Sequence, residues 1–260
     1  MNRVNIILAA YNGEKYIGEQ IDSILNNSFT DWNLWIFDDG SSDGTGSIVN
    51  GYVLKHPDKI KYICNASNKG LTLNFLEGLR YVADCKREMP EKESSKMQEY
   101  YMFCDQDDVW MPDKIDKTYK RMKKLERKYS SDTVATVFTD AEVVDEQLRM
   151  IYPSFFQSSK LDTKKKDLAH ILMENKLIGC TVMVNEALVK KITILPTKAR
   201  YHDWWIALLA ASFGQISYLP EATIQYRQHS NNIVGNQNFL GYVKKRISSL
   251  QMQKEVLHKT

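Results

Sequence analysis

Two short acidic clusters, each directly after an apolar run, are the residues of this chain best suited to chemistry. The first, DDGSSD at residues 38–43, follows residues 34–37, and the second, DQDD at residues 105–108, follows residues 100–104. Carboxylates at the edge of a buried strand are costly unless a cation or hydrogen-bond donors meet them. Both clusters therefore indicate a polar ligand, together with a divalent cation, at the ends of two strands.

The second cluster contains a DxD pair. Asp105 and Asp107 are two residues apart, so in an extended segment their carboxylates point to the same side. Converging carboxylates suit Mn²⁺ or Mg²⁺, which keep positions open for phosphate oxygens. Acidic turns without a metal are also common, and Asp108 could simply cap the next turn. The apolar strand before the pair favours metal binding.

The first cluster is typical of a tight turn from a strand into a helix, with Asp43 able to cap that helix. A turn explains residues 40–43 but not two consecutive acids at the strand end. We expect Asp38 and Asp39 to accept hydrogen bonds from a nucleobase or from ribose hydroxyls.

Cationic groups suited to a phosphate occur in two other places. An NKG triplet at residues 68–70 precedes a helix, where free backbone N–H groups and Lys69 would favour an anion, although the same triplet forms ordinary turns. Near the end of a later strand, Arg227 and His229 are suited to phosphate. A single histidine is more often structural than a ligand.

A carboxylate beside large aromatic rings begins an apolar helix at His202-Asp203-Trp204-Trp205. An acid at a helix start is commonly a cap. Aromatic faces beside a carboxylate are also a common way to hold a sugar ring. We therefore keep both interpretations of Asp203 open on the residues alone.

Strand and helix patterns alternate over the first part of the chain, which predicts an α/β fold with a parallel sheet covered on both faces. Ligands bind such sheets beyond the carboxyl ends of the strands, where both acidic clusters and the AYNG segment at residues 10–13 fall. The predicted strands are 4–10, 33–37, 60–64, 100–104, 134–138, 141–144, 177–184, 216–219 and 223–226. The predicted helices are 14–27, 45–55, 71–82, 113–128, 167–174 and 203–213.

The composition narrows the function classes. A net charge of +3 over 260 residues gives no argument for nucleic acid as a partner. Four cysteines without CxxC spacing make disulfides and zinc unfavourable and fit a reducing cytosol. The apolar segment at residues 4–10 is too short for a signal peptide, and no segment has the length of a membrane span. Residues 239–260 form a basic amphipathic helix candidate, suited either to an anionic membrane surface or to packing against protein.

Taken in order, the motifs resemble the family-2 inverting glycosyltransferases of the GT-A fold, nearest to the bacterial rhamnosyltransferase-like subset. The resemblance runs from about residue 4 to about residue 235. It rests on VNIILAAYNGEKYI, IFDDGSSDGT, NKG, YYMFCDQDDVW, IGCTVMVN, HDWWIALLA and YRQHSNN. It implies a GT-A domain at residues 1–235, with a nucleotide-binding half (1–110) and an acceptor half (111–235), followed by a helical tail (236–260).

The resemblance also implies roles for particular residues. Asp203 would be the general base and Asp107 the main metal ligand, with His229 beside it. Asp39, with Asp38 adjacent, would bind uracil or thymine and ribose. Further nucleotide contacts would come from Ala10, Tyr11, Asn12, Asn68, Lys69 and Asp105. Contacts to the donor or acceptor sugar would come from Gly179, Cys180, Thr181, His202, Trp204, Trp205 and Arg227.

The implied reaction is metal-dependent transfer of a sugar from a UDP- or dTDP-sugar to a hydroxyl of a glycan or lipid-linked acceptor, in bacterial surface polysaccharide synthesis. The QxxRW signature of processive synthases is missing, which argues against a polymerising enzyme. A non-catalytic nucleotide-sugar binding module and a sugar-phosphate nucleotidyltransferase are the alternatives. The expected location is cytoplasmic, with possible peripheral contact at the inner face of the membrane. Motif spacing does not specify the sugar, the base or the acceptor.

Overall fold

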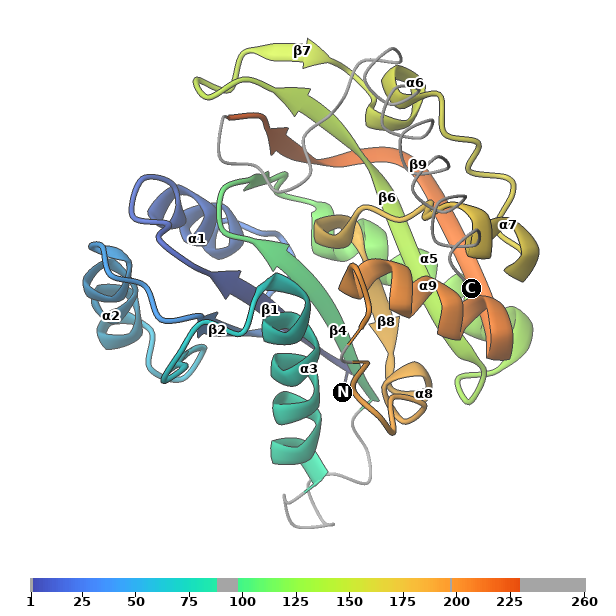
Figure 1. The fold of residues 1–260 in the computed structure, drawn as a ribbon, viewed down its shortest axis with the longest axis horizontal. Helices are drawn as coiled ribbons and strands as arrows, with labels where there is room; N and C mark the ends of the chain where they lie inside the picture. Colours follow the sequence, from blue (N-terminus) through green and yellow to red (C-terminus); the bar gives the residue numbers. More distant parts are fainter. Residues whose placement is uncertain (1, 88–97, 197, 230–260) are drawn as a thin grey trace, which may run out of the picture.

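The computed structural model describes residues 2–87, 98–196 and 198–229, which form a mixed sheet covered by helices (Figure 1). The strands are β1 (Asn2–Ala10), β2 (Trp32–Asp38), β3 (Ile60–Cys64), β4 (Gln98–Asp105), β5 (Val109–Trp110), β6 (Val134–Val144), β7 (Met150–Tyr152), β8 (Met183–Asn185) and β9 (Gly214–Arg227). The helices are α1 (Ile17–Leu25), α2 (Thr45–Lys55), α3 (Leu71–Arg87), α5 (Lys114–Tyr129), α6 (Phe155–Ser159), α7 (Leu168–Met173), α8 (Glu186–Val189), α9 (His202–Phe213) and the 3-10 helix η1 (Gly179–Thr181).

The first part of the sheet is parallel, in the order β3-β2-β1-β4. Every residue of β1 from Val4 onward is buried, as expected for a strand covered on both faces. The register places Ala10 opposite Asp38 and Ala9 opposite Asp105, so the carboxyl ends of three strands meet at one rim. The chain runs outward from β1 to β3 and then returns to the other side of β1. The carboxyl ends of the adjacent strands β1 and β4 therefore mark a topological switch point, where open α/β sheets bind ligands.

The second part of the sheet departs from the predicted elements. Residues 134–144 form the single strand β6, whose pairing with β9 is irregular at Thr139-Asp140, where an interruption was predicted. Asp140 accepts hydrogen bonds there from the N–H groups of Ala141 (2.8 Å) and Phe155 (3.1 Å). Residues 214–227 likewise form one long strand, β9. The strand predicted at 177–184 is wrong over most of its length: η1 occupies its middle, and β8 begins only at Met183.

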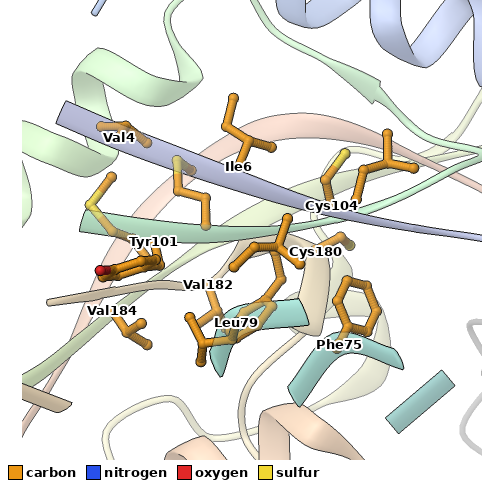
Figure 2. Close-up of a cluster of buried hydrophobic side chains, with 14 of the residues drawn as sticks. Val4, Ile6, Phe75, Leu79, Tyr101, Cys104, Cys180, Val182 and Val184 are labelled. Carbon is orange, nitrogen blue, oxygen red and sulfur yellow. The ribbon is translucent and has the colours of Figure 1, made fainter. Parts of the chain in front are cut away.

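Side chains from both parts of the chain share one core (Figure 2). The thiols of Cys104 on β4 and Cys180 in η1 are both fully buried there, and all four cysteines of the chain are free. Because η1 packs against β4, the segment leading to α9 is attached to the strand that carries the DxD pair. The labelled members of the cluster are Val4, Ile6, Phe75, Leu79, Tyr101, Cys104, Cys180, Val182 and Val184.

The predicted α/β class, with a largely parallel sheet flanked by helices, is confirmed. The predicted helical tail at residues 236–260 lies outside the described residues. Over the part of the chain that the structure describes, no helix combines the length and apolar character needed to cross a membrane.

Candidate active site

The loop after β1 forms one side of the rim, next to the buried backbone of Ala10. The ring of Tyr11 is half exposed, while its backbone N–H and C=O both hydrogen-bond to the side-chain amide of Gln106, at 2.9 and 3.0 Å. Gly13 makes room for that amide, since a Cβ there would lie 2.1 Å from Gln106 Oε1. Gln106, the middle residue of the DxD motif, therefore links the loops after β1 and β4.

Asp38 builds the turn after β2. Its Oδ1 accepts hydrogen bonds from the backbone N–H (2.8 Å) and hydroxyl (2.6 Å) of Ser41, and its Oδ2 accepts one from the hydroxyl of Tyr62 (2.6 Å). Asn12, in the left-handed region at φ 48°, accepts a hydrogen bond from the N–H of Ser42 (2.9 Å) and closes the same turn. Both carboxylate oxygens of Asp38 thus have partners within the protein and hold this turn in place, while its contact with a nucleotide stays a prediction.

Asp39 organises the NKG segment. Its Oδ1 accepts the backbone N–H of Lys69 (2.9 Å), and its Oδ2 accepts that of Gly70 (2.8 Å), which also lies 3.0 Å from Asn68 Oδ1. The Lys69 ammonium pairs with Glu77 at 2.6 Å. The N–H groups of Lys69 and Gly70 therefore bind Asp39 and are not free for a phosphate, while anion binding by the first turn of α3 stays a prediction.

The DxD pair and its neighbours gather negative charge at the end of β4. Asp107 Oδ2 lies 2.7 Å from His229 Nε2, and the His229 ring stacks on Tyr16 with a centroid distance of 5.0 Å. Burial, followed by the charges of Asp107 and Asp203, raises the pKa of Asp105 to about 7. Asp203, almost a hundred residues further along the chain, therefore acts electrostatically on the same site.

Arg227, predicted to contact a phosphate or sugar, is a structural residue in this geometry. Its side chain is only 3% exposed. Nε donates to the carbonyl of Asp107 (2.8 Å), Nη1 donates to the carbonyl of Glu146 (2.6 Å), and Nη2 pairs with Glu19. The guanidinium also lies over the ring of Tyr16, 4.7 Å from its centroid. Arg227 thus holds the DxD turn against α1 and the β6–β7 loop.

Two groups of residues at this end of the sheet could hold a metal ion. Ligand atoms of Asp105, Asp108 and Cys180 lie within 4.8 Å of one another, but Asp108 and Cys180 are fully buried, and burial raises the pKa of each well above its usual range. Burial therefore disfavours the ionised form of both groups, and a thiol suits Mn²⁺ or Mg²⁺ poorly. Asp107 and His229, whose side chains are 16% and 8% exposed, offer a carboxylate and an imidazole nearer the surface. We favour this pair, with Asp105 behind it, because converging carboxylates fit a hard cation.

Asp203 lies in the first turn of α9 and is partly buried. Its Oδ1 accepts the N–H of Trp204 (2.7 Å), and it also accepts hydrogen bonds from the backbone of Gly179 and the side chain of Asn175. Burial outweighs these donors and raises the pKa of Asp203 to about 6. A carboxylate that is oriented by three donors and titrates near neutrality has the properties of a general base.

His202 belongs to the core. Its ring is 4% exposed and lies 4.1 and 5.0 Å from the ring centroids of Phe75 and Phe103, and neither ring nitrogen has a hydrogen-bond partner among the described residues. Burial lowers the pKa of His202 to about 3, so the ring is neutral. Gly179 is required here, because a Cβ would lie 2.6 Å from His202 Nε2. The predicted sugar contact by His202 is not supported.

The other predicted sugar contacts are also largely internal. Cys180 and Thr181 are fully buried. The indole N–H of Trp204 donates to the carbonyl of Ile171 in α7 (2.7 Å), and the indole nitrogen of Trp205 is buried. These residues position α9 and η1, and the backbone of Gly179 contributes directly by bonding Asp203.

Sequence reasoning missed five residues that organise the site. Only Gln106 carried a signal, through its place inside the DxD motif. The others are ordinary polar or aromatic residues on a helix or loop, and their importance appears only when the chain is folded. The five are Tyr16, Glu19, Gln106, Glu146 and Asn175.

Comparison with known proteins places this geometry in context. Residues 5–183 match the model of the family described as glycosyl transferase family 2. The dTDP-rhamnosyl transferase RfbG of Shigella flexneri is 30% identical over 238 residues, which cover 88% of this chain and 73% of RfbG. The chain spans about two thirds of the length of the curated relatives it matches.

Solved structures share the fold. S. aureus TarS residues 1–349 in complex with UDP matches with a TM-score of 0.62 at 19% identity, over 87% of this chain and 60% of that one. The mannosyltransferase PcManGT from Pyrobaculum calidifontis, in complex with GDP-Man and Mn²⁺, matches with a TM-score of 0.62 at 16% identity, over 88% of this chain and 58% of that one. The predicted GT-A fold is confirmed by these likenesses.

Proposed function

The chain belongs to glycosyl transferase family 2, and from that premise we propose that it transfers a sugar from a nucleoside-diphosphate donor to an acceptor hydroxyl with inversion at the anomeric carbon. The observation that carries the proposal is the convergence of two carboxyl groups from distant segments. Asp105 ends β4, and Asp203 lies in the first turn of α9. Gly179 of η1 donates a hydrogen bond to Asp203, η1 packs against β4, and the charge of Asp203 contributes to raising the pKa of Asp105. These contacts support a single site for the donor-binding group and the base.

Asp203 acts as the base in the proposed reaction. The acceptor oxygen attacks the anomeric carbon, its proton passes to a carboxylate oxygen of Asp203, and the bond from that carbon to the diphosphate oxygen breaks. A pKa of about 6 leaves Asp203 mostly ionised at neutral pH and still basic enough to take the proton. The donors from Trp204, Gly179 and Asn175 fix the direction of the carboxylate.

Asp107 and His229, with Asp105, are the residues that would hold Mn²⁺ or Mg²⁺. The bound ion would neutralise charge on the diphosphate leaving group. This chain contributes the fixed position of Asp107: Arg227 holds the backbone carbonyl of that residue, and His229 holds its carboxylate. PcManGT, which shares the fold, was solved with Mn²⁺.

The donor is proposed to be a UDP- or dTDP-sugar, bound across the loops after β1, β2 and β4. Support comes from the names of the similar proteins, a dTDP-rhamnosyl transferase and a UDP complex. In this proposal the half-exposed ring of Tyr11 lies against the base. The carboxylate of Asp39, already fixed by the NKG backbone, accepts one further hydrogen bond from the base. The acceptor is a hydroxyl of a glycan or lipid-linked sugar in bacterial surface polysaccharide synthesis.

The organisation of the chain follows from the same proposal. Residues 1–110 would form the nucleotide-binding half of a domain that extends to residue 235, residues 111–235 the acceptor half, and residues 236–260 a separate tail. The proposed location is cytoplasmic, where nucleotide sugars are made.

Replacing Asp203 by Asn tests the proposal. We expect turnover, measured as nucleoside diphosphate released in the presence of acceptor, to fall by about 10²–10⁴-fold, while the affinity for the nucleotide stays within a few-fold. Asp116→Asn is a matched control, because Asp116 is an acid in the first turn of α5. A wild-type chain that binds nucleotide sugar without ever releasing the diphosphate would instead be a non-catalytic binding module.

A further inference from the structure

A small helix beside the proposed base carries an exposed apolar and basic surface. In α7, Leu168, Leu172 and Met173 are 39%, 60% and 73% exposed. Lys164 and Lys165, just before the helix, are also exposed. We call these five residues the α7 face. Large apolar side chains exposed this far and grouped on one short segment indicate an interaction surface.

The α7 face is firmly attached to the helix that carries Asp203. Ile171, the buried residue of α7, packs into the core, and its carbonyl accepts the indole N–H of Trp204 at 2.7 Å. Figure 1 shows α7 beside α9. Two residues after Met173, Asn175 donates a hydrogen bond to Asp203. Whatever binds the α7 face therefore lies next to the proposed base.

The charged residues that border the α7 face favour an anionic partner. Residues 160–166 contain four lysines and one acid, Asp162, which lies 3.9 Å from Lys165 Nζ. Asp167 is paired with His170 at 2.6 Å. Apolar side chains bordered by lysines match an anionic lipid surface, where the apolar groups enter the headgroup boundary and the ammonium groups meet the anionic headgroups.

We propose that the α7 face binds the surface of an anionic lipid bilayer and so presents Asp203 to an acceptor hydroxyl held at that surface. The part concerning the acceptor depends on the proposed function, whereas lipid binding by the α7 face does not. Binding through Leu172 and Met173 brings Asn175 and Asp203 to the level of the headgroups. This geometry suits an acceptor that is anchored in the bilayer and carries its sugar just above it.

Vesicle co-sedimentation of the full chain tests lipid binding. The vesicles are phosphatidylcholine, with or without a minor fraction of phosphatidylglycerol. We expect binding to the anionic vesicles, and a loss of about tenfold or more in affinity for either Leu172→Ser/Met173→Ser or Lys164→Gln/Lys165→Gln. Leu54→Ser/Lys55→Gln is the matched control, because it removes the same kinds of exposed side chain from α2, at the far end of the molecule (Figure 1), and it leaves affinity unchanged.

Three results would overturn the proposal. One is equal binding of the wild-type chain and both α7 variants to anionic vesicles. Another is an equal loss of affinity for anionic vesicles in the control variant Leu54→Ser/Lys55→Gln. The third is a change in the sedimentation coefficient of the protein alone on Leu172→Ser/Met173→Ser, which would show that protein, either a second copy or another segment of the chain, covers the face.

Turnover with a soluble acceptor separates this proposal from the proposed function. The α7 variants should keep turnover with a short soluble acceptor and lose it only with an acceptor presented on vesicles. If the wild-type chain showed no transfer to any acceptor, the proposed function would fail, and the vesicle measurement would still decide the role of the α7 face.

Discussion

The two sides of the site treat their carboxylates in opposite ways. On the side formed by β1 and β2, Asp38 and Asp39 are buried, and each of their oxygens accepts a hydrogen bond from the protein. On the side formed by β4 and α9, burial raises the pKa of Asp105 to about 7 and that of Asp203 to about 6. On one side the hydrogen-bond donors satisfy the carboxylates, and on the other burial outweighs the donors that are present.

The contrast separates positioning from reaction. A carboxylate saturated by backbone N–H groups shapes a turn rigidly and has little left to give to chemistry. A carboxylate buried with too few donors costs stability, but it can take a proton or attract a cation near neutral pH. We expect substitutions on the two sides to change the free energy of unfolding in opposite directions and by different amounts.

The largest effect on nucleotide affinity should come from Asp107→Ala. Loss of the main proposed metal ligand should lower Mn²⁺-dependent affinity for UDP or dTDP by more than about 100-fold, since even outer-shell changes at metal sites cost 10–100-fold. Isothermal titration with and without Mn²⁺ measures it. If the variant lost affinity equally in the absence of Mn²⁺, the residue would act on the nucleotide directly and not through a cation.

Asp203→Asn should stabilise the protein above pH 7. The folded pKa of about 6 lies above the ordinary value of 3.8, so ionising Asp203 destabilises the fold as pH rises between these values, and the penalty is complete above pH 6. Removing it should raise the free energy of unfolding at pH 8 by up to about 3 kcal/mol relative to the change near pH 4. The cost of placing an amide against the donors of Asp203 is the same at both pH values and cancels in this difference. Urea unfolding at both pH values measures the difference. A gain of equal size at both would mean that packing, and not charge, is responsible.

Asp39→Asn should do the reverse and destabilise the protein. An amide in place of the carboxylate puts an N–H group against the N–H donors of Lys69 or Gly70, at a cost of about 1–3 kcal/mol. Thermal or urea unfolding measures the loss, and Asp58→Asn on an exposed loop is the control. If the unfolding free energy of Asp39→Asn equalled that of the wild-type chain, the turn would not depend on this carboxylate. The side formed by β1 and β2 would then not be stabilised by its carboxylates as described.

The pH dependence of turnover should show the smallest effect. With the pKa of Asp203 at about 6, kcat/KM should fall about tenfold for each pH unit below 6, as the base becomes protonated. The neutral His202, with a pKa near 3, should not contribute over this range. A pH–rate profile of the wild-type chain measures this fall in kcat/KM. The residual activity of Asp203→Asn should not show the fall below pH 6.

The regular part of the fold could be predicted well from local patterns. The first four strands, and the helices α1, α2, α3 and α5, follow from apolar runs and helical spacing, which are properties of short segments. The errors fall where tertiary contacts decide. Thr139-Asp140 was predicted to break a strand, but the strand continues with only an irregular pairing there, and the N–H groups of Ala141 and Phe155 satisfy Asp140.

The candidate site was predicted in outline but not in its division of roles. The motifs predicted Asp105, Asp107 and Asp203 for one site, and the charges of Asp107 and Asp203 both act on Asp105. Arg227, His202, Cys180 and Thr181 were expected at the ligand and are buried. Residue type alone cannot distinguish an arginine that binds a phosphate from one that donates to three backbone or side-chain groups of its own chain.

By itself, the sequence determined which strands form, that their polar carboxyl ends would meet at one rim, and which acids would be there. These depend on the alternation of apolar and polar residues, which acts over a few positions. The tertiary structure alone decided which of those acids are satisfied and which remain charged and partly buried. That outcome depends on donors from segments as distant as β9, η1 and the NKG turn, because desolvation and hydrogen bonding are set by whatever atoms the fold brings within a few ångströms.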